Sequence, residues 1–78
     1  MNIEEALIWV ADLFEEPVED IQPETLREDI PAWDSLGVLT LMASLDEDFD
    51  ILLTDEEMQG LQKIDDIFEI LRSKGHLS

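Results

Sequence analysis

The segment PAWDSLGVL, residues 31–39, places Ser35 between an aspartate and a leucine at the start of an apolar run. A serine that attacks a substrate needs a base to take its proton, and that base is usually a histidine oriented by a third group. The only histidine, His76, lies beyond Gly75 near the C-terminus, where we expect a solvated tail residue. No cysteine could act in place of the serine. We therefore predict that the chain is not an enzyme.

Carboxylate pairs offer a second kind of chemistry, general acid–base catalysis. Asp55 with Glu56 and Asp65 with Asp66 are adjacent in the sequence. Neighbouring residues on a helix point in different directions, so such pairs do not converge on one substrate. Carboxylates near a helix N-terminus are also favoured by the helix dipole. We interpret both pairs as structural features of helix starts.

Metal binding is a third kind of chemistry, because the acidic segment from Asp46 follows the ligand spacing of an EF-hand calcium loop. The residues at loop positions one, three, five, nine and twelve are Asp46, Asp48, Asp50, Thr54 and Glu57. The loop needs glycine at position six for its sharp turn, and this chain has Ile51, a β-branched residue that disfavours positive φ. We therefore disfavour an EF-hand, expect no more than weak nonspecific cation binding, and predict no metal site.

Hydrophobic periodicity predicts the helices that would position these groups. Asn2 and Glu5 have the spacing of a capping box, and Pro17 blocks continuation of the helix that follows. Its inward stripe is Ile3, Leu7, Val10 and Phe14. Residues 16–34 hold all three prolines and no sustained period, so we expect a long loop that packs across the bundle. Its apolar anchors would be Val18, Ile21, Leu26 and Ile30.

Three further helices follow this loop. The second helix should begin near Ser35, where both Asp34 and Ser35 are good capping residues. Its stripe is Val38, Leu41, Met42, Leu45 and Phe49, widened by Leu36, Leu39 and Ala43. A short third helix should run from a capping box at Thr54 to Leu61. The last helix is built on Ile64, Ile67, Phe68 and Leu71 and ends at Lys74 and Gly75.

These elements predict an all-α fold, a small four-helix bundle with a long loop between helices one and two and a short third helix. We expect one domain, residues 1–78, whose stability comes from core packing because cysteine is absent. The chain begins with a polar first turn and has no apolar run long enough to cross a bilayer. We expect a complete, soluble, cytoplasmic protein that is a monomer.

The charge is strongly one-sided, with 21 Asp and Glu against four Lys and Arg and a net charge of −17. No basic side chain lies between Glu28 and Gln62. Such a field repels nucleic acid and anionic membranes and attracts basic protein surfaces. We therefore expect protein partners with basic docking patches, and neither nucleic acid nor a membrane as a partner.

The tripeptide DSL at residues 34–36, after a long first loop and at the start of the second of four helices, resembles the acyl carrier protein family. The segments LDEDFDILLTDEE, residues 45–57, and IDDIFEIL, residues 64–71, extend the resemblance over nearly the whole chain. It implies that Ser35 is the attachment point for 4'-phosphopantetheine, which a separate phosphopantetheinyl transferase takes from coenzyme A. The arm would carry acyl groups as thioesters to loading and transfer enzymes of a fatty-acid, polyketide or related pathway.

The same resemblance implies roles for residues near the serine and in the core. The transferase would recognise Asp34 beside its metal ion, and Leu36 would contact partner enzymes. An acyl chain would be sheltered between the second and third helices by Val38, Leu41, Met42, Leu45, Phe49, Met58 and Leu61. Methionines adapt their shape to such a guest. The alternative interpretation is that these residues form an ordinary core.

One departure from the family concerns the exposed face of the second helix. Primary fatty-acid carriers generally have acidic residues there soon after the serine, whereas here the acids are delayed to Asp46 and Glu47. We predict a partner surface of Leu36, Trp33, Gly37, Thr40, Asp46 and Glu47. Trp33 would either be exposed beside the arm or pack over the long loop. The departure favours a specialised carrier over the primary fatty-acid carrier.

Two alternatives share this fold. An aminoacyl or peptidyl carrier would also load Ser35, and the strong acidity favours acyl chains over it. An interaction subunit without an arm would use only the acidic face to recruit a basic partner. The intact DSL argues against that second alternative, because a protein without an arm does not need this serine.

Overall fold

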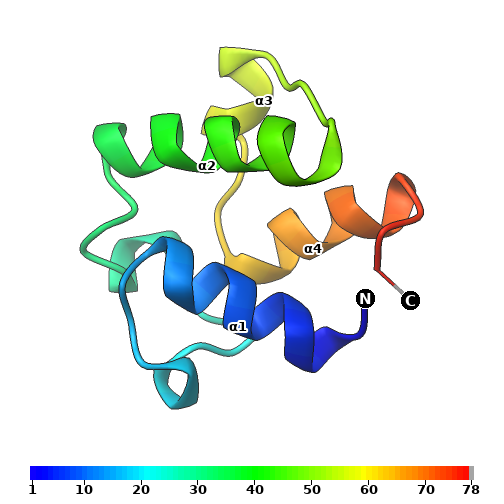
Figure 1. Cartoon of the computed structure of the whole chain (residues 1–78). Coiled ribbons are helices and arrows are strands. Elements are labelled where there is room, and N and C mark those ends of the chain that lie inside the picture. Colours follow the sequence, from blue (N-terminus) through cyan, green and yellow to red (C-terminus); the bar gives the residue numbers. More distant parts are fainter. Residues whose placement is uncertain (78) are drawn as a thin grey trace.

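Four α-helices and two short 3₁₀ turns account for the regular structure in the computed structural model, which describes residues 1–77. The helices are α1 (Ile3–Leu13), α2 (Ser35–Phe49), α3 (Asp55–Gln59) and α4 (Ile64–Ser73). Figure 1 shows the N-terminus beside the segment that follows α4. The predicted all-α bundle with a short third helix is confirmed. No helix among the described residues has the length and apolar character that a bilayer crossing requires.

Reciprocal side-chain caps begin α1 and α3, as the sequence predicts. The Asn2 side chain accepts the Glu5 N–H at 2.8 Å, and the Glu5 carboxylate accepts the Asn2 N–H at 2.9 Å. Thr54 and Glu57 form the same arrangement at 3.1 and 3.0 Å. Each box satisfies backbone donors that a helix start otherwise leaves unpaired. The short α3 therefore begins at a defined residue, and it ends at Gln59, two residues before the predicted Leu61.

The adjacent acids at the start of α4 also have structural partners. Asp66 accepts the backbone N–H groups of Gln62 at 2.8 Å and Lys63 at 3.2 Å. Asp65 pairs with Arg72 at 3.2 Å, two turns along the same helix. These contacts agree with the interpretation of this pair as part of a helix start.

The core lies where α1, α2 and α4 meet. Phe68 of α4 and Leu41 of α2 are fully buried. The buried apolar residues of the helices are Ala6, Val10, Ala11, Val38, Leu41, Leu45, Met58, Ile64, Ile67, Phe68 and Leu71. The predicted stripe of α4 is therefore buried along its whole length. The predicted widening of the α2 stripe is wrong, because Leu36, Leu39 and Ala43 are exposed to solvent.

The long loop is more ordered than its sequence indicates. It contains two 3₁₀ turns that periodicity missed, η1 (Val18–Asp20) and η2 (Arg27–Asp29). Of the four predicted anchors, Ile21 and Ile30 are buried, whereas Val18 and Leu26 are about two-fifths exposed.

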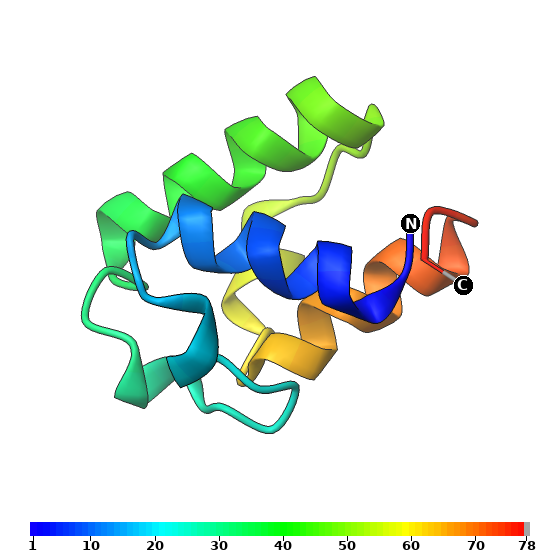
Figure 2. The same cartoon turned by 60° about the horizontal axis from the view of Figure 1, so that its bottom comes forward.

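Backbone hydrogen bonds tie this loop to the segment between α3 and α4. Arg27 N–H donates to the Gln62 carbonyl at 2.8 Å, and Ile64 N–H donates to the Thr25 carbonyl at 3.0 Å. A single antiparallel bridge joins Leu26 to Lys63 between these two bonds. Figure 2 shows the loop alongside the first turn of α4. The loop is therefore fixed in two ways, by Ile21 and Ile30 in the core and by the bridge between Leu26 and Lys63.

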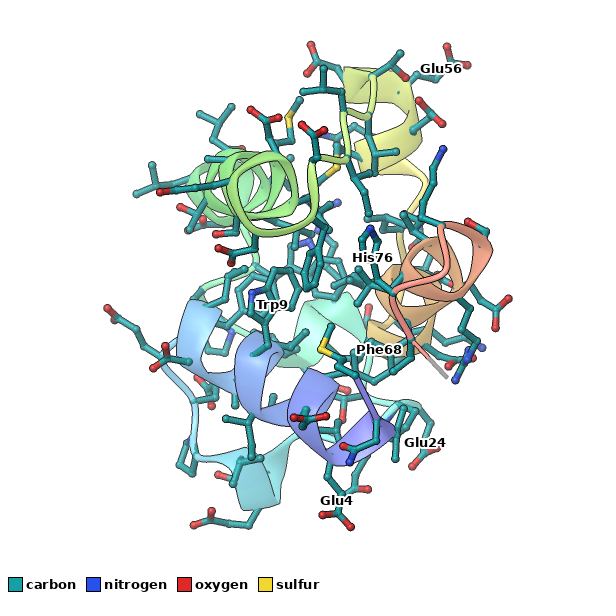
Figure 3. All side chains as sticks on the ribbon, turned by 45° about the vertical axis from the view of Figure 1, so that its right-hand side comes forward. Glu4, Trp9, Glu24, Glu56, Phe68 and His76 are labelled. Atoms are coloured by element: carbon teal, nitrogen blue, oxygen red, sulfur yellow. The ribbon has the colours of Figure 1, made fainter. Side chains whose placement is uncertain are left out.

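The C-terminal segment packs onto the bundle. The His76 ring lies 5.1 Å from the Phe49 ring, and the His76 carbonyl accepts the Met1 ammonium at 2.9 Å. Phe49 also contacts Trp9 edge to face at 5.1 Å, and the Trp9 indole N–H donates to Asp48 at 2.8 Å. In Figure 3 the Trp9 and His76 side chains both point into the space between α1, α2 and α4. The prediction of His76 as a solvated tail residue is therefore wrong.

Glu57→Gln should change how stability depends on pH. The Thr54 backbone N–H, and then its hydroxyl, hold the pKa of Glu57 below its ordinary value. A carboxylate with a lowered folded-state pKa stabilises the fold above its ordinary pKa, and that contribution is lost as pH falls through the lowered value. We would measure the free energy of unfolding in urea at pH values from about 3 to about 6. The difference between wild type and E57Q should be larger at the higher pH values. Equal differences throughout would contradict this.

Gly37→Ala should destabilise the fold. A Cβ at Gly37 would lie 2.9 Å from the Ala32 carbonyl carbon and nearer still to its oxygen, so backbone would have to move. We expect a loss of about 2 kcal/mol or more in urea unfolding, typical of overpacking. Gly60→Ala is the matched control, because its nearest neighbour is the Glu57 carbonyl oxygen at 3.4 Å. Equal stability of the two variants would refute the close approach.

Candidate functional site

Ser35 is the first residue of α2, and its side chain is exposed. The residue before it, Asp34, is the N-cap, and its carboxylate accepts the Gly37 N–H at 2.9 Å. Among residues 1–77 the Ser35 hydroxyl has no hydrogen-bond partner, since the capping role belongs to Asp34 alone. The serine is therefore free to react without loss of the helix cap.

The backbone around Ser35 suits a negatively charged group. Val38 N–H begins the helical bonding by donating to the Asp34 carbonyl at 2.9 Å, and the cap takes the Gly37 N–H. Within the described chain the N–H groups of Ser35 and Leu36 have no acceptor. Free N–H groups at the positive end of a helix dipole favour anions such as a phosphodiester.

Two predicted contact residues, Trp33 and Gly37, are buried instead and fix the orientation of the serine. Trp33 is 3% exposed, and its ring stacks on Phe14 at 5.2 Å between centroids. Gly37 is buried against the Ala32 carbonyl, which only a residue without a side chain permits. Trp33 therefore packs into the interior instead of being exposed beside the arm. Neither residue belongs to an exposed partner surface, so that part of the prediction is wrong.

The exposed face of α2 changes character along its length. Near the serine it is apolar, with Leu36 72% and Leu39 60% exposed. Thr40, also exposed, donates its hydroxyl to the Leu36 carbonyl at 3.1 Å. Asp46 and Glu47 are exposed near the far end of the helix. An apolar patch therefore lies beside Ser35, and the acidic patch lies about three turns away.

The residues predicted to line an acyl pocket are packed as core in this structure. Val38, Leu41, Leu45, Met58 and Leu61 are buried, while Met42 and Phe49 are partly buried and pack against them. The pockets described next lie elsewhere. Whether these residues open to admit a chain stays a prediction.

Two pockets flank the start of α2. The larger, of about 500 Å³, is lined by Leu26, Arg27, Glu28, Ile30, Pro31, Trp33 and Gln62. The smaller, of about 250 Å³, is lined by Leu13, Glu15, Ala32, Asp34, Leu36, Gly37 and Thr40. No sequence pattern predicts Arg27 and Gln62 as pocket residues, because only the bridge between the loop and the α3–α4 segment brings them together.

The structure lacks the geometry that an EF-hand loop or a histidine-activated serine would require. Asp46 and Asp48 lie in the last turn of α2, and Asp50 caps that helix in a left-handed conformation, so residues 46–57 do not form an EF-hand loop. No cluster of metal-binding side chains occurs within residues 1–77. His76 packs on the last residue of α2, about 21 Å along the helix from Ser35. It is too far away to activate the serine.

Comparison with known proteins adds independent evidence. No family model matches the chain. It is 40% identical over 47 residues to the acyl carrier protein of Buchnera aphidicola subsp. Baizongia pistaciae, a match over 60% of this chain and 59% of that protein, less than two thirds of its length. It is 33% identical over 57 residues to the acyl carrier protein of Desulforapulum autotrophicum, covering 73% of this chain and 74% of the relative.

A third match spans most of the molecule. The chain is 32% identical over 73 residues to the acyl carrier protein of Thermosynechococcus vestitus, covering 92% of this chain and 89% of the relative. This match leaves only a small part of the chain outside it. The chain therefore belongs to the acyl carrier protein family, whose members are carriers rather than enzymes.

Proposed function

We propose that Ser35 carries a 4'-phosphopantetheine arm and that the arm's thiol holds acyl intermediates as thioesters. The observation that carries this proposal is the exposed, unpaired hydroxyl at the first position of α2, directly after the Asp34 cap. The free N–H groups of the first helical turn would favour the phosphodiester that attachment creates. The imported thiol would also supply the sulfur chemistry that a chain without cysteine lacks.

The arm would be attached by a separate phosphopantetheinyl transferase. The Ser35 oxygen would form a bond to phosphorus, the pyrophosphate bond of coenzyme A would break, and adenosine 3',5'-bisphosphate would leave. A base on the transferase would take the hydroxyl proton, because no base among residues 1–77 hydrogen-bonds to Ser35 and the Asp34 carboxylate is engaged by the Gly37 N–H. The exposed Asp34 carboxylate would be recognised beside the metal ion of the transferase.

Acyl-loading and acyl-transfer enzymes would dock on the exposed face of α2. The apolar patch of Leu36 and Leu39 would meet an apolar surface close to the arm, with Thr40 at its edge. Asp46 and Glu47 would meet a basic patch further along the helix. This arrangement favours a specialised carrier of a fatty-acid, polyketide or related pathway. We propose in addition that it acts in the cytoplasm as a monomer.

Ser35→Ala should abolish loading. With a broad-specificity transferase, magnesium and fluorescently labelled coenzyme A, the wild type should become labelled and S35A should not. Ser44→Ala is the matched control, a half-buried serine on the same helix, and it should label like the wild type. Because Asp34 supplies the helix cap, S35A should keep wild-type stability within about 0.5 kcal/mol. Label on S35A would refute the attachment site.

Asp34 variants should separate capping from recognition. Asp34→Asn keeps a good capping group and removes the charge, so its stability should stay near that of the wild type. Asp34→Ala removes both and should lose about 1 kcal/mol in urea unfolding. Both variants should load at least about tenfold more slowly, a change worth about 1.4 kcal/mol in the barrier. Wild-type loading by D34N would show that the transferase does not need this carboxylate.

A further inference from the structure

The larger pocket combines apolar walls with a cation. Its apolar side is formed by Leu26, Ile30, Pro31 and Trp33. Its volume of about 500 Å³ lies within the range of small-ligand sites, about 300–1,000 Å³. Arg27 and Gln62 add side-chain donors to this lining. Such a lining suits a small amphipathic ligand with an acceptor at one end.

Arg27 is positioned but not neutralised. Its Nε–H donates to the Trp33 carbonyl at 3.3 Å, and Nη1 donates to Gln59 at 3.4 Å. The guanidinium also lies over the Trp33 ring, 5.8 Å from its centroid. Among the described residues it forms no ion pair, although the chain has 21 carboxylates, whereas Arg72 pairs with both Asp65 and Glu69. A guanidinium has five N–H groups, so most of those on Arg27 remain available to a carboxylate.

Trp33 also lines this pocket, and its indole gives a spectroscopic reporter beside Arg27. Its indole Nε1–H is buried and has no acceptor. Within residues 1–77, every other buried side-chain nitrogen or oxygen has a hydrogen-bond partner. A buried donor without a partner is costly, and such groups in native proteins call for an explanation. The nitrogen itself is enclosed rather than open to the pocket, so a ligand there would perturb it through the ring and not by a direct hydrogen bond.

The position of the pocket restricts how a ligand can reach it. Trp33 and Ser35 are two residues apart, a separation of at most about 7 Å. Because Arg27 Nε lies 3.3 Å from the Trp33 carbonyl oxygen, it is within about 10 Å of the Ser35 backbone. A phosphopantetheine arm is longer than this from phosphorus to sulfur, so a group on its thiol can fold back to Arg27.

The net charge of the chain favours a tethered ligand over a free one. At −17 the molecule repels anions in solution. A group attached to the same protein has a high effective concentration, which offsets that repulsion. Glu28 also lines the pocket, but its side chain is exposed and makes no ion pair with Arg27.

We propose that this pocket binds the distal carboxylate of an acyl group carried on Ser35. The carrier would then be matched to half-thioesters of dicarboxylic acids, with Arg27 holding the carboxylate and the apolar wall covering the carbon chain. This inference rests on the proposed attachment of the arm to Ser35.

The test compares two acyl groups of equal carbon number, succinyl and butyryl, which differ in the terminal carboxylate. Each is transferred to the protein as acyl-phosphopantetheine from its coenzyme A thioester, and intact mass establishes the loading. The readout is the ¹⁵N–¹H NMR signals of Arg27 Nε and Trp33 Nε1. We expect succinyl to shift both signals relative to the arm alone, and butyryl to leave them in place.

Variants assign that shift to the pocket. In Arg27→Gln the succinyl shift at Trp33 should be lost, and in the matched control Arg72→Gln, which removes an arginine from α4, it should persist. If R27Q does not fold, the comparison of succinyl with butyryl on the wild type still tests whether the pocket binds the carboxylate. Loading without a difference between the two groups, or an equal shift from the arm alone, would overturn this inference and leave the carrier function intact. Failure to load either group would overturn both.

Discussion

The close approach of the Ala32 carbonyl to Gly37 is the constraint on which the site depends. It brings the last residues of the long loop onto the first turn of α2, where a side chain of any size would hold them apart. The contact fixes the position at which the loop ends, so that Asp34 can cap the helix through the Gly37 N–H. Trp33 is then directed inward to Phe14, and Ser35 outward to solvent. One glycine thus links the packing of the loop to the exposure of the serine.

More of the acidic side chains accept backbone N–H groups at helix starts than form ion pairs. Glu5, Asp34, Glu57 and Asp66 each accept backbone N–H groups at a helix start, where a negative charge is favoured. Among the described residues, the ion pairs are confined to Arg72 with its two neighbours on α4. The remaining carboxylates are exposed, apart from the partly buried Glu16, and Arg27, Lys63 and Lys74 form no ion pair among the described residues.

Local patterns predicted the helices well because their signals lie within a few residues. The capping boxes at Asn2 and Thr54 and the stripe of α4 depend on spacing alone, and all three are found. Features that depend on distant contacts were missed or wrong. The burial of Trp33 requires Phe14, the C-cap residue of α1, and the packing of His76 requires Phe49 of α2. The Arg27 pocket exists only because the loop pairs with the segment before α4, a contact with no short-range pattern.

The central claim is that a single serine at the start of α2 carries the arm. Its most direct test is tandem mass spectrometry of proteolytic peptides, after the protein has been incubated with transferase, magnesium and coenzyme A. The account predicts one phosphopantetheine per chain, located on Ser35. Modification of another hydroxyl, or none while a control carrier is modified in the same mixture, would contradict it.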